Sequence, residues 1–322
     1  MPALVSVIVP CFNYGRYLPE CVASLTRQSY GNWECIIVDD GSTDDTPAVC
    51  ARLVSADIRI RVVRQENRGL SAARNAGIEL ARGEFIQFLD ADDMLECNKL
   101  GTQVVYLESH KDVDIAFGQA AFFGPGAPAR LRSRRGEGSG GATVEVEGRD
   151  LPVLTALVAG NIGVVNAALV RRKVLDAVGR FDVELKSHED WDFWLRCALA
   201  GCWFGSVPAA GARALVREHG PSMSRTRKAM LKSAIQIREH LVTLLPAQLH
   251  LANAALLAQA RAALGIELVG RGNLRDGWAL YREACRLAPR KLKPALQVVR
   301  LVPGAAGAVR IVRKLFRRLQ PR

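Results

Sequence analysis

The chain has 322 residues, of which 49% are hydrophobic and 24% charged, a composition typical of a soluble globular protein. This length allows one large α/β domain with an appendage, or two domains. The net charge of +12 is uneven, because residues 225–322 hold 20 Lys and Arg against 4 Asp and Glu, giving +16 there and −4 elsewhere. This split argues against a nucleic-acid-binding catalytic domain and for a separate basic element that meets an anionic partner.

Eight cysteines are spread along the chain without a C-x-x-C pair or a spacing typical of zinc sites. Several lie in apolar stretches, where a free cysteine packs as a small hydrophobe. We therefore expect a reducing, cytoplasmic compartment. The sequence opens directly into a strand pattern, so no signal peptide is expected, and no apolar run is long enough to predict a membrane-spanning helix.

Buried strands and amphipathic helices alternate in the first part of the chain. Strands are predicted at 5–10, 35–38, 60–63 and 85–89, and helices at 16–28, after the loop 39–44, and at 69–82. This alternation predicts an α/β, Rossmann-like fold with a mostly parallel central sheet and helices on both faces. A helix at 151–159, a strand near 164–170 and a helix after the acidic cluster 188–192 are expected to follow.

We predict two domains, a catalytic domain at 1–224 and a basic α-helical extension at 225–322. Residues 124–149 are rich in Gly, Pro, Arg and Ser, and we interpret them as a flexible, exposed excursion. Residues 309–319 alternate apolar and basic side chains at helical spacing, which is typical of a helix on an anionic membrane surface. A helix whose apolar face packs on the domain is the alternative. We expect peripheral association with the inner face of the cytoplasmic membrane.

Two acidic loops follow predicted strands. Asp39 and Asp40 end the second strand, whereas Asp90, Asp92 and Asp93 end the fourth. Carboxylates this close repel one another unless a cation lies among them. A hard divalent cation that completes its shell with water and substrate phosphates suits such a loop. Because consecutive α/β units are usually neighbours, we expect both loops on adjacent strands at one ligand-binding edge of the sheet.

A third acidic pair, Glu189 and Asp190, opens a helix, where the helix dipole favours an ionised carboxylate. The three clusters could hold a metal, hold a polar ligand and supply one free carboxylate. This combination indicates metal-assisted transfer from a phosphorylated donor. The metal would offset the charge of a departing diphosphate while the free carboxylate takes the proton of an attacking hydroxyl.

Five motifs in order make residues 4 to about 224 resemble a family 2 glycosyltransferase, from the large inverting group with the nucleotide-sugar-binding A-type fold. The motifs are VSVIVPCFN at 5–13, IVDDGSTD at 37–44, NRGLSAARNAG at 67–77, DADD at 90–93 and EDWDFWLR at 189–196. Each motif alone is weak evidence, whereas five in matching structural context are specific.

The resemblance implies a role for each motif. Asp190 is expected to be the catalytic base. Asp92 is expected to bind Mn²⁺ or Mg²⁺, and His219, in a stretch that resembles the family's Arg-x-His-x-x-Ser-x-Ser pattern, to close over the metal or diphosphate. The residues expected to bind the nucleotide sugar are Pro10, Phe12, Asn13, Asp39, Asp40, Asn67, Gly69, Arg74, Asp90 and Glu189.

The expected activity is inverting, metal-dependent transfer of a sugar from a nucleotide-diphosphate donor to a hydroxyl. UDP-sugars are the commonest expectation for the donor, and a glycan or lipid-linked acceptor of cell-envelope polysaccharide synthesis is expected by family analogy. Nucleic acid is not an expected partner.

Structural roles stay open for several of these residues. Asp39 could cap a turn, Arg74 could be a helix-surface charge paired with Glu79 or an aspartate, Glu189 could be a solvated helix-start carboxylate, and His219 could be structural. The two tryptophans of the last motif are interpreted as core residues or walls of the acceptor site.

Two other functions are alternatives to glycosyl transfer. A nucleotidyltransferase would show a Gly-rich, Lys-containing loop after the first strand, and the loop at 11–16 (CFNYGR) is not one. A catalytically silent nucleotide-sugar-binding scaffold of a glycan assembly complex would be indicated by loss of Asp92 or Asp190, and both are present.

Overall fold

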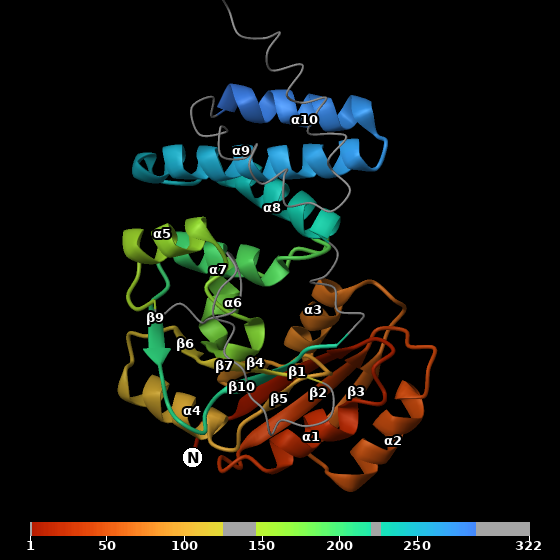
Figure 1. Ribbon diagram of the computed structural model, residues 1–322. Coiled ribbons are helices and arrows are strands. Elements are labelled where there is room, and N and C mark those ends of the chain that lie inside the picture. The colour runs from red at the N-terminus through yellow and green to blue at the C-terminus, as the bar shows by residue number, and fades with distance from the viewer. Residues whose placement is uncertain (1, 125–145, 220–226, 288–322) are drawn as a thin grey trace, which may run out of the picture. The chain divides into compact units, whose positions relative to one another are not determined.

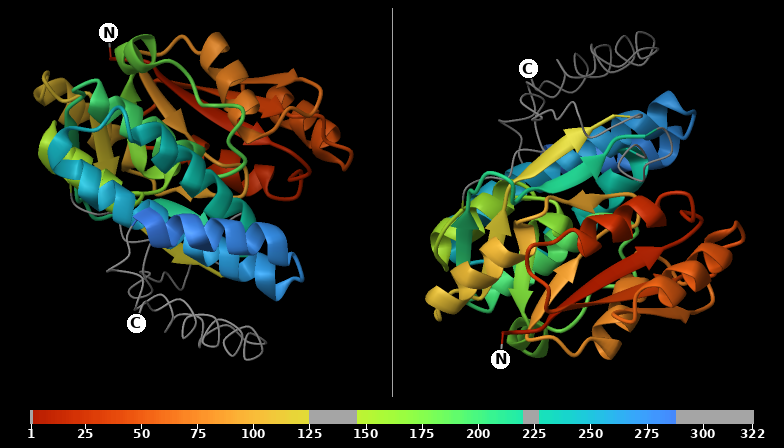
Figure 2. Two further views of the ribbon diagram at one scale, coloured as in Figure 1. Left: turned by 90° about the horizontal axis from the view of Figure 1, so that it is seen from above. Right: turned by 90° about the horizontal axis from the view of Figure 1, so that it is seen from below.

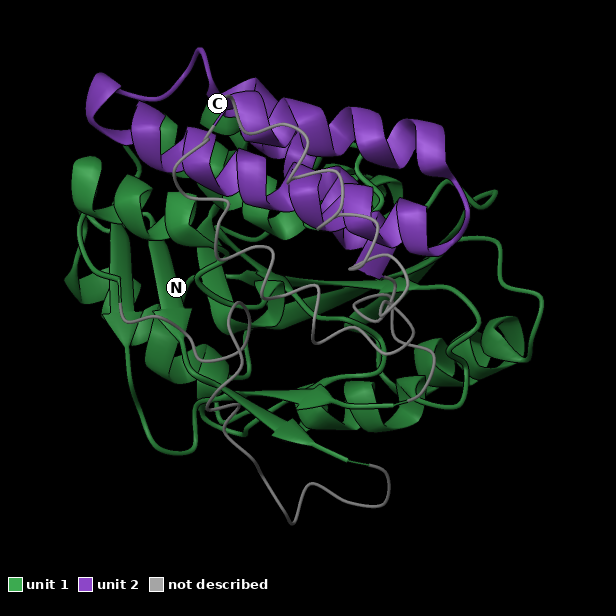
Figure 3. Cartoon of the chain, turned by 45° about the horizontal axis from the view of Figure 1, so that its top comes forward, with its two compact units in different colours: residues 1–222 green, residues 223–322 purple. Residues whose placement is uncertain are grey.

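The computed structural model describes residues 2–124, 146–219 and 227–287 (Figure 1). The chain divides into two compact units, residues 1–222 and 223–322 (Figure 3). The predicted amphipathic helix at 309–319 and most of the predicted excursion at 124–149 lie outside the described residues.

A seven-stranded sheet forms the centre of the first unit, in the order β3-β2-β1-β4-β8-β6-β9. Strands β3, β2, β1 and β4 are parallel, β8 is antiparallel to both β4 and β6, and β9 is parallel to β6. The central strands β1, β2 and β4 are buried along their whole length and mostly apolar, because both faces of the sheet are covered. The bounds are β1 Val5–Cys11, β2 Trp33–Asp39, β3 Ile60–Arg64, β4 Phe85–Phe88, β6 Ile115–Gly118, β8 Ala168–Arg171 and β9 Phe204–Val207.

Helices cover both faces of this sheet (Figures 1 and 2). Helix α3 packs on β1 and β2, where Gly77 permits a close approach, because a Cβ atom there would lie 2.3 Å from Ile8 Cγ2. A smaller three-stranded sheet has the order β5-β10-β7. The remaining elements of this unit are α1 Leu18–Thr26, α2 Thr46–Ala56, α3 Leu70–Leu80, α4 Lys99–Ser109, α5 Leu151–Ala159, α6 Arg172–Val178, α7 Glu189–Leu199, the 3₁₀ turn η1 Val165–Ala167, β5 Met94–Leu95, β7 Ala120–Phe123 and β10 Ala214–Arg217.

Two details of the predicted topology are wrong. The acidic loops after β2 and β4 do not end adjacent strands, because the chain returns after β3 and places β4 on the other side of β1. The loop after β1 therefore lies between them, at the switch point where open α/β sheets bind ligands. The strand expected near 164–170 begins only at Ala168, because buried Asn166 occupies a 3₁₀ turn and its side chain bonds to the loop after β4.

Over its described residues 227–287 the second unit is helical, as predicted, with α8 Arg227–Leu241, α9 Ala247–Gly270 and α10 Leu274–Leu287. Helices α9 and α10 approach closely, since a Cβ atom on Gly277 would lie 2.6 Å from Gly265 O. Helices α9 and α10 pack around an apolar cluster of Ala258, Ala262, Tyr281 and Ala284, and α8 packs on α9 through Ile235, Leu257, Leu264 and Leu268. None of the helices in the described ranges is long and apolar enough to cross a membrane. All eight cysteines are free.

Candidate active site

Hydrogen bonds of Asn13 connect the loop after β1 to the loop after β2. Asn13 adopts a left-handed backbone conformation (φ 57°), which asparagine tolerates better than most residues. Its Oδ1 accepts hydrogen bonds from the backbone N–H of Thr43 (2.7 Å) and Asp44 (3.3 Å), and its own N–H donates to Ser42 Oγ (2.9 Å). The neighbouring Phe12 ring is 46% exposed. The predicted nucleotide-binding turn is thus a rigid loop that presents an apolar ring to solvent.

Asp39 and Asp40 are both buried and hydrogen-bonded to backbone. Asp39 Oδ1 accepts from the N–H of Ser42 (2.9 Å), so the turn-capping alternative describes its position. Asp40 accepts from the N–H groups of Arg68 (2.9 Å) and Gly69 (2.8 Å), which fixes the loop that leads into α3. Each carboxylate therefore holds a loop of the predicted nucleotide site in shape.

The other residues of the predicted nucleotide site lie around these two carboxylates. Pro10 is buried in β1 opposite Val38 and lies beyond the last residue pair between β1 and β4. Proline has no backbone N–H, and at this position no hydrogen bond between the strands requires one. Asn67 is exposed, and Gly69 has φ 90°, a conformation that disfavours side chains with a Cβ. Sequence-distant loops thus converge at one edge of the sheet.

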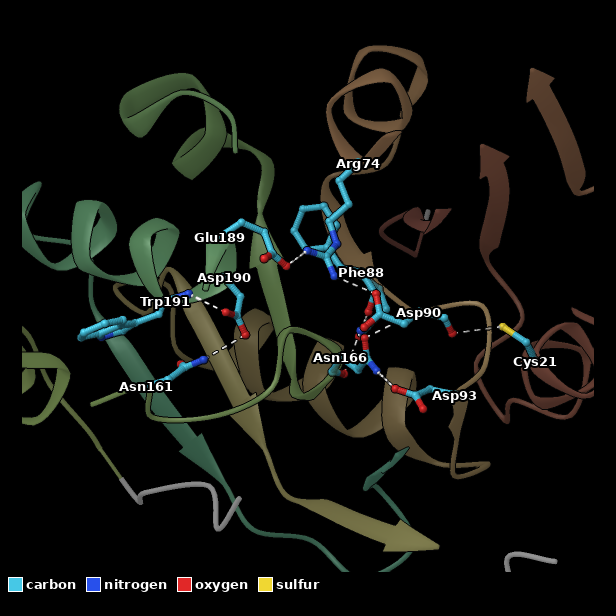
Figure 4. Close-up of polar contacts among 11 residues, drawn as sticks. Cys21, Arg74, Phe88, Asp90, Asp93, Asn161, Asn166, Glu189, Asp190 and Trp191 are labelled. Atoms are coloured by element: carbon cyan, nitrogen blue, oxygen red, sulfur yellow. Dashed lines mark hydrogen bonds and ion pairs between the residues drawn. The ribbon is translucent and has the colours of Figure 1, made fainter. Parts of the chain in front are cut away.

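Arg74 is the central cation of the site. Its guanidinium lies 2.7 Å from Asp90 Oδ1 through Nη2 and 2.5 Å from Glu189 Oε1 through Nη1 (Figure 4). Arg74 is 1% exposed and Glu189 is 8% exposed, so the surface-charge alternative for Arg74 and the solvated alternative for Glu189 are both wrong. Glu79, the other partner considered for Arg74, pairs with Arg180 instead.

The aspartates in the loop after β4 contact different partners. Asn166 Oδ1 accepts from the N–H of Asp90 (3.1 Å), and its Nδ2 donates to Asp93 (Figure 4). Asp93 also accepts from the N–H of Arg217 (2.7 Å). Burial raises the pKa of Asp93 well above its usual range, and the charges of Asp92 and Asp90 raise it further. Asp93 therefore faces the interior and secures the loop, which leaves Asp92 as the carboxylate that faces His219.

Asp92 and His219 form the candidate metal-binding pair. Asp92 Oδ2 lies 2.7 Å from His219 Nε2, and the imidazole is held by a stacked Tyr17 ring and an edge-on Tyr14 ring. The buried Nδ1 atom of His219 has no hydrogen-bond partner among the described residues. No group of three or more acidic, His or Cys side chains gathers as a metal cage in those residues. A carboxylate and an imidazole fit a divalent cation that completes its shell with water and substrate oxygens.

Asp190 stands in the first turn of α7, next to Glu189. Its Oδ1 accepts from the N–H of Trp191 (2.7 Å), and its Oδ2 accepts from Asn161 Nδ2 (2.9 Å) (Figure 4). Burial raises the pKa of Asp190 from an ordinary 3.8 to about 7, and the Glu189 charge adds to this rise. A carboxylate with a pKa near neutrality is suited to general base catalysis. Trp191 and Trp194 are buried core residues, one of the two roles interpreted for them.

Three residues of this site carried no signal that sequence reasoning used. Asn161 and Asn166 are single asparagines outside any recognised motif, and they contact carboxylates 29 and 73 residues away. Arg217 donates from Nε to Asp92 O (2.9 Å) and pairs with Glu20. Arg217 is the arginine of the Arg-x-His-x-x-Ser-x-Ser-like stretch, which could have drawn attention to it.

The family described as Glycosyl transferase family 2 matches residues 6–179, more than half of the chain. The chain belongs to glycosyltransferase family 2. Glycosyltransferase GlyG of Streptococcus pneumoniae is 44% identical over 119 residues, covering 37% of this chain and 39% of GlyG. Putative teichuronic acid biosynthesis glycosyltransferase TuaG of Bacillus subtilis is 43% identical over 105 residues, covering 32% of this chain and 42% of TuaG. The chain thus matches less than half the length of each of these two relatives.

Two solved structures resemble this family 2 chain over nearly its whole length. S. aureus TarS 1-349 in complex with UDP-GlcNAc aligns with a TM-score of 0.66 at 20% identity, covering 98% of this chain and 92% of that one. Mannosyltransferase PcManGT from Pyrobaculum calidifontis, in complex with GDP-Man and Mn²⁺, aligns with a TM-score of 0.61 at 20% identity, covering 96% and 87%. The predicted fold class, an A-type glycosyltransferase fold with a C-terminal helical extension, is confirmed.

Proposed function

We propose that this protein is an inverting, metal-dependent glycosyltransferase that moves a sugar from a nucleotide-diphosphate donor to a hydroxyl. The observation that carries the proposal is that the carboxylates of the site have different partners and surroundings. Asp92 faces an imidazole, Asp90 is bound to Arg74, and Asp190 combines a pKa of about 7 with hydrogen bonds from two neutral donors, Asn161 Nδ2 and the N–H of Trp191.

Asp92 and His219 are the residues that would hold Mn²⁺ or Mg²⁺. The metal, when bound, supplies positive charge that stabilises the departing diphosphate. An imidazole beside a carboxylate favours Mn²⁺, because Mg²⁺ prefers an all-oxygen shell. Arg217 and Asn166 keep the loop that carries Asp92 in place through hydrogen bonds to Asp92 O and Asp93.

Asp190 would act as the base in a single displacement. Its carboxylate takes the proton of the acceptor hydroxyl, and the hydroxyl oxygen forms a bond to the anomeric carbon. The bond from that carbon to the diphosphate oxygen breaks, and its electron pair leaves with the diphosphate. Attack from the side opposite the leaving group inverts the configuration at the anomeric carbon.

A UDP-sugar is the preferred donor, with GDP- and dTDP-sugars as the other classes. This preference is supported by the likeness to a structure with bound UDP-GlcNAc, while a second similar structure holds GDP-Man. The nucleotide would lie at the switch point between β1 and β4, on the loops fixed by Asn13, Asp39 and Asp40.

The acceptor we propose is a growing glycan or a lipid-linked glycan of cell-envelope polysaccharide synthesis, reached from the cytoplasmic side. Support comes from the name of TuaG, which refers to teichuronic acid biosynthesis. The basic charge of residues 225–322 suits an anionic acceptor or membrane surface.

The proposal is tested by comparing wild-type protein with Asp190→Asn. Donor binding and release of nucleoside diphosphate are measured with UDP-GlcNAc and Mn²⁺, and with the corresponding GDP- and dTDP-sugars. We expect Asp190→Asn to bind the donor with wild-type affinity and to lose turnover by at least about 100-fold, the usual contribution of a general base. Wild-type turnover in Asp190→Asn would remove Asp190 from the base role.

A further inference from the structure

We infer that Asn161 is a positioning residue for the base, holding the Asp190 carboxylate in the orientation from which it accepts a proton. This inference rests on the proposed function, because it assigns a partner to the proposed base. The contact that motivates it joins Asn161 Nδ2 and Asp190 Oδ2 at 2.9 Å (Figure 4).

The orientation of the Asn161 amide follows from its other contact. Asn161 Oδ1 accepts from the N–H of Gly163 (3.4 Å), so the donor end of the amide faces Asp190. Asn161 lies two residues beyond the end of α5, after Gly160. Trp191 Nε1 donates to Leu157 O (2.7 Å), which ties the end of α5 to the start of α7. The backbone that carries Asn161 is thus anchored to the helix that carries the base.

The two hydrogen bonds to Asp190 leave the carboxylate able to react. The N–H of Trp191 occupies one acceptor position on Oδ1, and Asn161 occupies one on Oδ2. A carboxylate oxygen can accept two hydrogen bonds, so a position for the acceptor hydroxyl remains. Without Asn161 the carboxyl group would be held only from its own helix and could rotate about its side-chain bonds.

Asn161 also opposes the effect of burial on Asp190. Burial and the Glu189 charge raise the pKa of Asp190, whereas the Arg74 charge and the hydrogen bonds from Asn161 and Trp191 stabilise the ionised form. A donor of this kind contributes about 1 kcal/mol, so its loss should raise the pKa of the base by roughly one unit. Asn161 therefore keeps the base ionised in the neutral range in addition to orienting it.

The first test needs no substrate. Aspartate carboxyl carbons are labelled with ¹³C in the full chain, the Asp190 resonance is assigned by its absence in Asp190→Asn, and its titration is followed by NMR. In Asn161→Ala we expect the Asp190 titration to move up by roughly one pH unit. In Asn161→Asp the shift should be larger, because two facing carboxylates share one proton. An unchanged Asp190 titration in both variants would overturn the inference.

The control is Trp191→Phe, which removes the hydrogen bond from Trp191 Nε1 in α7 to Leu157 O in α5 and leaves the hydrogen bonds of the Asp190 carboxylate in place. We expect this variant to lower the melting temperature and to move the Asp190 titration much less than Asn161→Ala does, because the hydrogen bond from Asn161 to Asp190 remains. A shift in Trp191→Phe equal to that in Asn161→Ala would show that Asn161 acts only through general packing, and would overturn the positioning role.

The second test measures release of nucleoside diphosphate against pH. Asn161→Ala should bind the donor with wild-type affinity, and its kcat at the high-pH plateau should be about 10- to 100-fold lower than that of wild type. The acidic limb of its pH–kcat profile should move to higher pH. A rise in donor Kd with unchanged kcat would contradict the inference. Turnover by Asp190→Asn at the wild-type rate would defeat the proposed base instead, so failure of the inference and failure of the function are distinguishable.

Discussion

Arg74 of α3 and Glu189 of α7 form a buried ion pair between residues 115 positions apart in the sequence, with 2.5 Å between Nη1 and Oε1. The same guanidinium binds Asp90 in the loop after β4. Arg74 thus connects the loop of the candidate metal pair to the helix that carries the candidate base. In the proposed function its role is to fix these two parts relative to each other.

Removal of Arg74 should destabilise the fold strongly. Arg74→Leu leaves Glu189 buried without a cation, which typically costs about 3 kcal/mol or more. The side chain of Asp90 is 33% exposed, so solvent reduces its share of this cost. Urea unfolding followed by tryptophan fluorescence measures the change.

The matched control is Arg180→Leu, which removes an arginine from the exposed pair with Glu79. Exposed pairs contribute about 0–1 kcal/mol, so this variant should unfold near the wild-type midpoint. Equal midpoints for Arg74→Leu and Arg180→Leu would show that the buried bridge does not hold the site together.

The rate of transfer should depend on the ionisation of Asp190. The proposed base would work only when deprotonated, and the pKa of Asp190 is raised from 3.8 to about 7 by burial and by Glu189. kcat/KM should therefore rise about tenfold per pH unit below 7 and level off above it. An acidic limb near pH 4, the range of an ordinary aspartate, would contradict this environment for the base.

Glu189→Gln should move that limb to lower pH. The variant removes the neighbouring negative charge that helps to raise the pKa of Asp190, and leaves the Arg74 cation with one carboxylate fewer. Both changes favour the ionised form of the base. The pH dependence of kcat/KM is measured for Glu189→Gln and wild type under the same conditions. A shift of the acidic limb to higher pH in the variant would contradict this prediction.

Metal-dependent donor binding should require both members of the Asp92–His219 pair. Asp92→Ala and His219→Ala should each weaken Mn²⁺-dependent binding of UDP by about 10-fold or more, comparable with loss of a supporting contact at a metal site. Isothermal titration of UDP with and without Mn²⁺ measures this effect. His110→Ala, which changes an exposed histidine stacked on Tyr106, serves as the control and should bind as wild type does.

Much of the fold was predictable from local sequence. The strands at 5–10 and 35–38 and the helix at 151–159 are confirmed within about two residues, because continuous apolar runs and helical spacing act over a few positions. Strand order was not predictable in this way. After β3 the chain crosses back so that β4 pairs with β1 and not with β3. No residue of β4 by itself predicts which of these two strands it pairs with.

The carboxylates of the candidate site stood out in the sequence, whereas the contacts they make did not. Asp90, Asp190 and Glu189 stood out as clustered charges, whereas their contacts depend on folding between distant segments. Arg74 shows the difference, because its nearest sequence partner, Glu79, pairs with Arg180 while Arg74 points into the interior. Asn161 was missed for the same reason, since a single asparagine gains meaning only from the carboxylate it faces.

The most direct test of the central claim is the thermal stability of the full chain with UDP-, GDP-, dTDP- and CMP-sugars, each with and without Mn²⁺. One nucleotide class should stabilise the fold by roughly 2.7 kcal/mol at about 100 times its dissociation constant. This stabilisation should need the metal and should disappear in Asp92→Ala. Absence of a shift for every nucleotide sugar, or an equal shift without metal, would contradict a metal-dependent nucleotide-sugar site.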